Sequence, residues 1–352
     1  NIETAARLSY GFSNEKINYD LGLKYFFDDK QQFYFGLQYY DALKRIDDPY
    51  IIRVPTITWT ALLNKSDYGD YYYAKGGEMS VGYGFGQLRF IRRDVFERPY
   101  QLKLFVRSEE QNTAINNANF SLLNNKGKFR DNPTITEGVM NSFGFDLSWN
   151  FNRARRMSNL GFYFGAEFSD PDIIKTDFDF ARYLFMMNLR TKTLPLWMLD
   201  IRFSAGMGTG KMPAQKFFSI ESSSSFIAGN SSFRSMDTKE FYGDRFWAFS
   251  FEHNFGEVIP GILRIPGIAE FGIEFFLYSN IGYSDFTENA LFSYKNGTPE
   301  IPNTTASTSD KFYYEFGLGL NRLLLFFRID VAARFSQYET PKFSFTVTNA
   351  TF

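Results

Sequence analysis

The feature that most constrains the fold of this chain is an alternation of apolar or aromatic residues with polar ones, repeated from end to end. Each repeat extends over about eight to twelve residues and is followed by a polar connection. In one repeat the apolar positions are Leu160, Phe162, Phe164, Ala166 and Phe168, and the positions between them are Gly161, Tyr163, Gly165 and Glu167. Because a period of two places successive side chains on opposite faces of a β-strand, the pattern predicts an all-β fold of about fourteen strands.

Composition decides which kind of β-protein this is. Aromatic residues make up 20% of the 352 residues, with 43 Phe and 22 Tyr, yet the mean hydropathy is only -0.29. A membrane barrel has this mixture because its outer face is apolar and its interior is wet, whereas the two-sheet core of a β-sandwich has little room for so many aromatic rings. We therefore predict that residues 1–352 form one transmembrane antiparallel β-barrel domain of 14 strands, or 16 if two strands are hidden in long loops or precede Asn1.

The charged residues of the strands support a barrel because they share the polar face. A Lys or Arg on the lipid face near the middle of a bilayer costs about 2–4 kcal/mol. The charged residues on the polar face are Arg7, Lys24, Lys103, Asp146, Glu167, Asp200, Arg202, Glu274, Glu315, Arg328 and Asp330.

The connections indicate the orientation in the membrane. Long loops follow Tyr40, Val106, Met207 and Tyr283, and short connections follow Phe26, Phe151, Leu189 and Leu320. Short turns of bacterial barrels normally face the periplasm, so we predict a multi-pass protein of the bacterial outer membrane, with membrane lipid as its surroundings. There is no apolar run of 18 residues and no signal peptide at Asn1, and we expect a mature or partial product.

Several function classes are excluded by composition. The 38 basic and 39 acidic residues leave a net charge of -1, which gives no basis for binding nucleic acid. Cysteine is absent and His253 is the single histidine, so we predict neither a metal site nor a cofactor. His253 lies on the apolar face of its strand and suits an interfacial aromatic belt, and the serines at 222–225 suit a flexible loop. We expect no enzymatic activity.

The alternation is interrupted most clearly in residues 211–256. A Ser-, Gly- and Asn-rich loop there contains the compact segment Phe233, Arg234, Ser235 and Met236 and continues into an alternating strand that carries Glu252 on its polar face. If the loop folds into the lumen, Arg234 can form a charge-assisted pair with Glu252. The alternative is an arginine exposed on a surface loop, the commonest place for this residue type.

This region resembles the BamA/TamA superfamily of outer-membrane assembly barrels, also called surface-antigen-type barrels. The resemblance extends from residues 233–236 over Glu-Phe-Tyr-Gly-Asp-Arg at 240–245 to Phe-Glu-His-Asn-Phe-Gly at 251–256. It is greatest to a Bacteroidota branch in which a carboxypeptidase-regulatory-like periplasmic domain precedes the barrel. The resemblance implies that an Arg-Gly-aromatic tip inserts into the barrel and that its Arg pairs with acidic residues of the next two strands. Arg234 and Glu252 match that pattern, whereas Ser235 replaces the usual Gly, Met236 the aromatic residue and Asn280 the second acid.

The resemblance also implies a function in protein insertion or translocation at the outer membrane. Its expected partners are subunits of an assembly machine and unfolded outer-membrane protein clients, and its expected mechanism uses a weak seam between the first and last strands. We assign the C-terminal strand signal to Phe343, Phe345 and Phe352. The main alternative is a passive porin or substrate-specific channel with the long loop as a constriction, and a barrel that displays adhesive loops is a further one.

Overall fold

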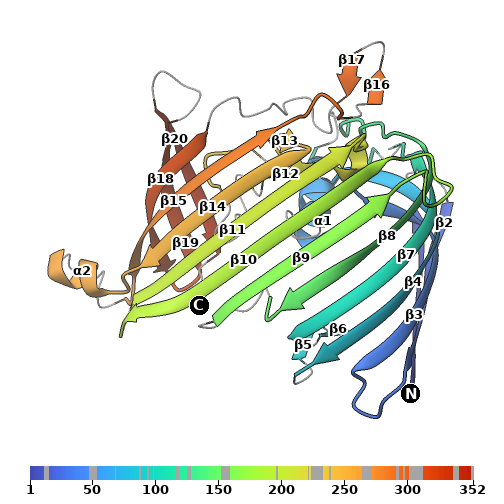
Figure 1. The fold of residues 1–352 in the computed structure, drawn as a ribbon. Helices are drawn as coiled ribbons and strands as arrows, with labels where there is room; N and C mark the ends of the chain where they lie inside the picture. The colour runs from blue at the N-terminus through green and yellow to red at the C-terminus, as the bar shows by residue number, and fades with distance from the viewer. Residues whose placement is uncertain are drawn as a thin grey trace.

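A computed structural model describes most of the chain. The described residues are 1–11, 16–46, 54–67, 69–86, 89–92, 95–97, 99–115, 119–124, 128–151, 159–195, 197–220, 222, 233–237, 239–263, 271–290, 293–295, 298–300, 312–335 and 341–349. Fourteen strands form one antiparallel sheet that curves into a barrel wall (Figure 1), which confirms the predicted fold class and strand number.

Neighbouring strands in the sheet follow one another in chain order, with each strand hydrogen-bonded to the next. The strands are β1 (Ile2–Gly11), β2 (Lys16–Phe26), β3 (Phe33–Arg45), β4 (Tyr71–Phe85), β7 (Tyr100–Thr113), β8 (Gly138–Trp149), β9 (Asn159–Ser169), β10 (Phe180–Leu194), β11 (Trp197–Gly210), β14 (Arg245–Asn254), β15 (Glu274–Asp285), β18 (Tyr313–Leu323), β19 (Phe327–Arg334) and β20 (Lys342–Asn349). Nine of them precede the loop at residues 211–244 and five follow it, as the alternation predicts.

The two faces of the wall differ in the way that the alternation requires. Large apolar side chains such as Leu104 and Phe316 point outward and are exposed, while Glu315 and Arg328 on the inner face are buried. Aromatic pairs bridge neighbouring strands on the outer face, for example Phe145 and Phe164, whose ring centroids are 5.5 Å apart. An exposed apolar outer face, backed by an inner face that carries buried charged residues, is typical of the wall of a membrane-spanning barrel. In the described part of the chain, no helix is long and apolar enough to cross a membrane.

The four longest connections, residues 46–70, 114–137, 211–244 and 286–312, lie at one end of the barrel, and short helices and strands occur at both ends. At the long end lie α1 (Val54–Asn64), the 3₁₀ helix η1 (Ala214–Lys216), and the short pairs β12 (Phe218–Ser219) with β13 (Tyr242–Gly243) and β16 (Ser293–Lys295) with β17 (Thr298–Glu300). At the other end lie α2 (Val258–Leu263) and the hairpin of β5 (Arg89–Arg92) and β6 (Val95–Glu97). None of these short strands joins the main sheet, so the described residues contain no hidden pair of wall strands.

One boundary differs from the sequence prediction. The pattern is lost between residues 41 and 77, which predicts a long loop, yet β3 continues to Arg45 and β4 begins at Tyr71. Here both faces of the paired strands carry Tyr and Lys residues. Strand ends outside the bilayer core do not need an apolar outer face, so the alternation disappears while the backbone pairing continues.

The ends of the sheet are β1 and β20. Among the described residues these two strands form no ladder with each other, and the residues of β1 are exposed on both faces except at its end. The largest apolar cluster lies inside the wall, where the loop at 211–244 packs against inward-facing residues of the strands. It consists of Met140, Phe178, Phe180, Leu184, Met186, Met212, Ala214, Phe217, Phe218, Ile220, Phe233, Met236, Phe241, Tyr242, Phe246, Ala248 and Tyr313.

Candidate functional site

We call the connection between β11 and β14, residues 211–244, the luminal loop, because its described residues fold into the barrel interior. Its described tip, residues 233–236, is buried, with Phe233 and Met236 within the apolar cluster. The Phe233 ring packs against the Tyr313 ring of β18 with 5.4 Å between centroids. The nearby Gly282 of β15 leaves room for Phe233, because a Cβ at this position would lie 3.2 Å from the phenyl ring.

The Arg234 guanidinium lies against two carboxylates on the inner face of the wall. Its Nη2 donates to Oε2 of Glu252 on β14 at 2.6 Å, and its Nε lies 3.1 Å from Oδ1 of Asp330 on β19. Only 1% of the Arg234 side chain and 1% of the Asp330 side chain is exposed. Such pairs are strong in a dry interior but leave a costly charge behind when one partner is removed.

A second arginine completes this cluster. Arg328 of β19 donates from both terminal nitrogens to Glu252, at 2.9 and 2.8 Å, and its Nη2 also bonds Asp330 at 3.0 Å. Two guanidinium groups and two carboxylates are thus brought together by the luminal loop, β14 and β19. Because the four charges balance, the cluster can remain ionised while buried.

Aromatic rings support the two guanidinium groups. The Arg234 Cζ lies 3.8 Å from the centroid of Tyr278, and the Arg328 Cζ lies 3.6 Å from that of Phe276. Both rings belong to β15 and lie over glycines of β18: Gly317 is opposite Tyr278 and Gly319 is opposite Phe276. A Cβ at either glycine would come within 2.3 Å of the ring, so the glycines make the stacking possible.

Glu315 of β18 binds the backbone of the loop tip. The N–H groups of Arg234 and Ser235 donate to its two carboxylate oxygens at 2.7 and 2.8 Å. The Ser235 hydroxyl also donates to Glu315, and Tyr313 donates from its hydroxyl at 3.0 Å. A carboxylate that accepts two successive backbone N–H groups fixes the conformation of the tip, which a side-chain pair alone does not do.

Asn280 of β15 takes part in the same arrangement in a different way from the expected one. Its side-chain amide donates to Glu315 Oε1 at 2.7 Å, so it orients the carboxylate rather than pairing with Arg234. The second acidic partner of Arg234 is Asp330. An amide serves at position 280 because it can donate to a carboxylate, which an aspartate there cannot do when ionised.

The tip is also joined to the last two strands. Arg334 of β19 donates to both carboxylate oxygens of Glu240 in the luminal loop, at 3.1 and 2.7 Å. The Ser344 hydroxyl of β20 donates to the Arg234 carbonyl at 3.4 Å. The loop tip therefore contacts β14, β18, β19 and β20, the strands that approach one edge of the sheet.

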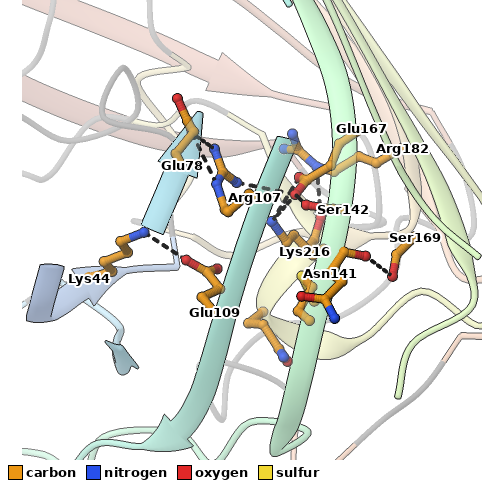
Figure 2. A network of polar contacts seen from close by, with 12 residues as sticks. Lys44, Glu78, Arg107, Glu109, Asn141, Ser142, Glu167, Ser169, Arg182 and Lys216 are labelled. Atoms are coloured by element: carbon orange, nitrogen blue, oxygen red, sulfur yellow. Dashed lines mark hydrogen bonds and ion pairs between the residues drawn. The ribbon is translucent and has the colours of Figure 1, made fainter. Parts of the chain in front are cut away.

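The beginning of the luminal loop is anchored to a different part of the wall (Figure 2). Lys216 binds both carboxylate oxygens of Glu167 on β9, at 3.0 and 2.7 Å, and Glu167 also accepts from Arg107 of β7. The preceding Gln215 donates to Gln111 of β7 at 2.7 Å. A charged network in the lumen thus joins the beginning of the loop to β7 and β9, which precede the loop in the chain. The strands that hold Arg234, β14 and β19, follow it.

A third anchor joins the end of the luminal loop to the connections at the long end. Asp70, which is buried just before β4, accepts from Lys239 Nζ at 2.7 Å and from the Tyr242 hydroxyl at 3.1 Å. Arg130 from the connection between β7 and β8 also pairs with Asp70. Burial alone would raise the pKa of Asp70, but Lys239 and Arg130 hold that pKa below its usual value.

This third anchor predicts a pH-dependent contribution to stability. Because the pKa of Asp70 is lowered on folding, its pairing stabilises the fold fully above the unfolded value of about 3.9 and is lost as the pH falls through the folded value. We expect the difference in unfolding temperature between the wild type and Asp70→Asn to be constant above about pH 5 and to shrink towards pH 2. The unfolding temperature of each protein is measured from the gel mobility of samples heated to increasing temperatures at each pH. A difference that does not change with pH would contradict this assignment.

The remaining predicted residues lie away from this cluster. Phe343 and Phe345 of β20 point outward and are exposed, and Phe352 lies outside the described residues. His253 lies on the outer face between Trp197 and Phe255, and its Nε2 is 2.8 Å from the Thr193 hydroxyl. This is an aromatic-belt environment, in agreement with the sequence interpretation of His253.

No family model matches the sequence, and no curated protein matches it. Among solved structures, the chain is similar to BamA from Haemophilus ducreyi lacking POTRA domains 1–3, with 8% identity, a TM-score of 0.49, and coverage of 96% of this chain and 62% of that one. It is also similar to CdiB from Acinetobacter baumannii, with 10% identity, a TM-score of 0.40, and coverage of 100% and 53%. OccK10 (OpdN) from Pseudomonas aeruginosa has 10% identity, a TM-score of 0.28, and 99% of each chain covered. This chain thus spans less than two thirds of the BamA and CdiB chains.

Proposed function

We propose that this chain is an outer-membrane barrel of the assembly or translocation type, which acts in or alongside the insertion of other outer-membrane proteins. The observation that carries the proposal is the buried clamp on Arg234, in which a loop tip inside the lumen is held by Glu252, Asp330 and Glu315. A clamp of this kind braces the barrel from within. The role does not require covalent chemistry, and we propose none.

The edges of the sheet supply the second half of the proposed mechanism. In the described residues no ladder joins β1 to β20, so each of these strands has one edge that faces no other strand of the sheet. An unfolded client strand can add to such an edge by the same hydrogen bonds that join wall strands. The clamp reaches β19 and β20 through Arg334 and Ser344, and it therefore holds one side of this seam in place while a client strand pairs.

The packing of the lumen favours this function over a passive channel. A channel needs a wet path along its axis, but the luminal loop packs an apolar cluster against inward-facing residues such as Leu184, Phe246 and Tyr313. As part of the same proposal, we infer that this chain is related to the BamA/TamA superfamily. Its partners would then be subunits of an assembly machine, and a periplasmic domain would precede the barrel.

Removal of the Arg234 side chain tests the proposal. The wild type in phospholipid vesicles is expected to accelerate the folding of a urea-unfolded eight-stranded outer-membrane protein, measured by gel mobility of unheated samples. With Arg234→Ala the client should fold no faster than in protein-free vesicles. The reason is that the loop tip loses its ion pairs with β14 and β19, and the edge of the sheet is then no longer held in place. Arg245→Ala is the matched control, since Arg245 is an arginine of β14 whose ion pair with Asp285 is partly exposed.

Two outcomes would contradict the proposal. One is an Arg234→Ala variant that folds, resists heat and accelerates the client as well as the wild type does. The other is a wild-type protein without effect on the client that forms a stable, large pore in planar bilayers, which is the behaviour of a channel.

A further inference from the structure

The connection between β14 and β15 differs from its neighbours at the same end of the barrel. Residues 27–32 and 324–326 are tight links between adjacent wall strands, whereas residues 255–273 contain α2. The α2 sequence, Val-Ile-Pro-Gly-Ile-Leu, contains no charged or polar side chain. Apolar side chains that are exposed together on a connection commonly mark a surface that contacts a membrane or another protein.

The strand ends beside α2 carry an aromatic belt. The Trp197 ring packs edge-on against Phe255 and His253, with centroids 5.0 and 5.5 Å apart, and Phe255 is 6.2 Å from Phe275. These residues point outward, and such belts mark the level where the hydrocarbon of a bilayer meets its head groups. The belt therefore places the bilayer surface at the ends of β11, β14 and β15.

α2 begins directly at this level. The Phe255 N–H donates to the Phe275 carbonyl at 2.8 Å and the Phe275 N–H to the Gly256 carbonyl at 3.0 Å, so the hairpin is paired up to Gly256, two residues before α2. Figure 1 shows α2 outside the outline of the barrel, to the side of the wall rather than across its opening. Ile262 of α2 is 73% exposed and Phe271, after the helix, is 72% exposed.

We propose that α2 and Phe271 form an anchor in the bilayer interface, inserted in the leaflet on the side of the short connections. The occupant is lipid, because α2 lies beside the wall next to the outward aromatic belt, and the exposed apolar side chains of Ile262 and Phe271 belong to the same connection as Phe255 of that belt. α2 itself contains no charged or polar side chain, which suits a segment that contacts a membrane. This anchor depends on the barrel spanning a membrane and not on the assembly function.

Site-specific fluorescence tests the proposal directly. The chain has no cysteine, so Ile262→Cys and Phe271→Cys each provide a single site for an environment-sensitive fluorophore. The full chain is reconstituted in phosphatidylcholine vesicles that carry a spin-label quencher either high or low on the acyl chain. We expect the fluorescence of both labels to be quenched more strongly by the quencher high on the acyl chain, near the head groups, than by the quencher low on the chain.

Two control sites calibrate the measurement. Leu104→Cys on the outer face of β7 should be quenched more by the low quencher, and Ile173→Cys, exposed in the connection between β9 and β10 at the other end, should be quenched by neither. If labels at 262 and 271 behave like the label at 173, the anchor does not exist. Blue-shifted but unquenched emission would instead mean that the segment packs against protein, which also overturns the proposal.

Discussion

Replacement of Glu252 by glutamine is expected to cost about 3–5 kcal/mol of stability, because it leaves a buried positive charge without its partner. Glu252 accepts from Arg234 and from both terminal nitrogens of Arg328, and in the variant Asp330 is the one remaining carboxylate of the cluster for both guanidinium groups. The midpoint of unfolding in urea, followed by the gel mobility of unheated samples in detergent, measures the effect.

The matched control uses a second ion pair that also involves β14. Arg245 and Asp285 pair across β14 and β15, but half of the Arg245 side chain is exposed. Exposed pairs contribute about 0–1 kcal/mol, so Asp285→Asn should hardly shift the midpoint. Equal shifts in Glu252→Gln and Asp285→Asn would show that the charge cluster does not stabilise the barrel.

Replacement of Glu315 by alanine is expected to release the loop tip from the wall. The N–H groups of Arg234 and Ser235 would both lose their acceptor, at about 1–3 kcal/mol for each buried donor, and Asn280 would lose its partner as well. Trypsin provides a local readout because it cuts after Arg234 and Lys239, which are both buried in the wild type. In Glu315→Ala we expect cleavage after Arg234, which is protected in the wild type, whereas Lys239, which Asp70 still binds, should stay protected in both proteins; mass spectrometry identifies the cut sites.

Glu315→Gln separates the loss of charge from the loss of the acceptor. The amide retains one oxygen but replaces the other with a donor, so one backbone N–H stays bonded and the second does not. Cleavage intermediate between those of the wild type and Glu315→Ala is the expected result. Protection of Arg234 in Glu315→Ala would contradict the role assigned to this carboxylate. Because Glu252 and Asp330 are unchanged in these variants, a loss of client folding in Glu315→Ala would tie the function to the conformation of the tip.

The sequence alone determined the strands, the two faces of each strand and the place where the alternation is interrupted by the luminal loop. The alternation is a local property, since each residue of a strand reports its face relative to its immediate neighbours. It was therefore sufficient to predict fourteen strands, the break at residues 211–244 and the inward side of Glu252, Glu315, Arg328 and Asp330. It failed at the ends of β3 and β4, where no bilayer imposes the pattern.

Only the tertiary structure decided which of these inward residues meet. Arg234 and Glu252 are 18 positions apart, and a loop that returns to the next strand brings them together. Arg328 lies 76 positions from Glu252 and Lys239 lies 169 positions from Asp70, so their contacts depend on the strand register around the whole wall and on the path of the loop through the lumen. The same dependence explains why Asn280 binds Glu315 and Asp330 takes the place beside Arg234. Alternation specifies the face on which a residue lies. Whether two inward residues touch also depends on how far along its strand each one lies, and this register is set by the hydrogen bonds between strands.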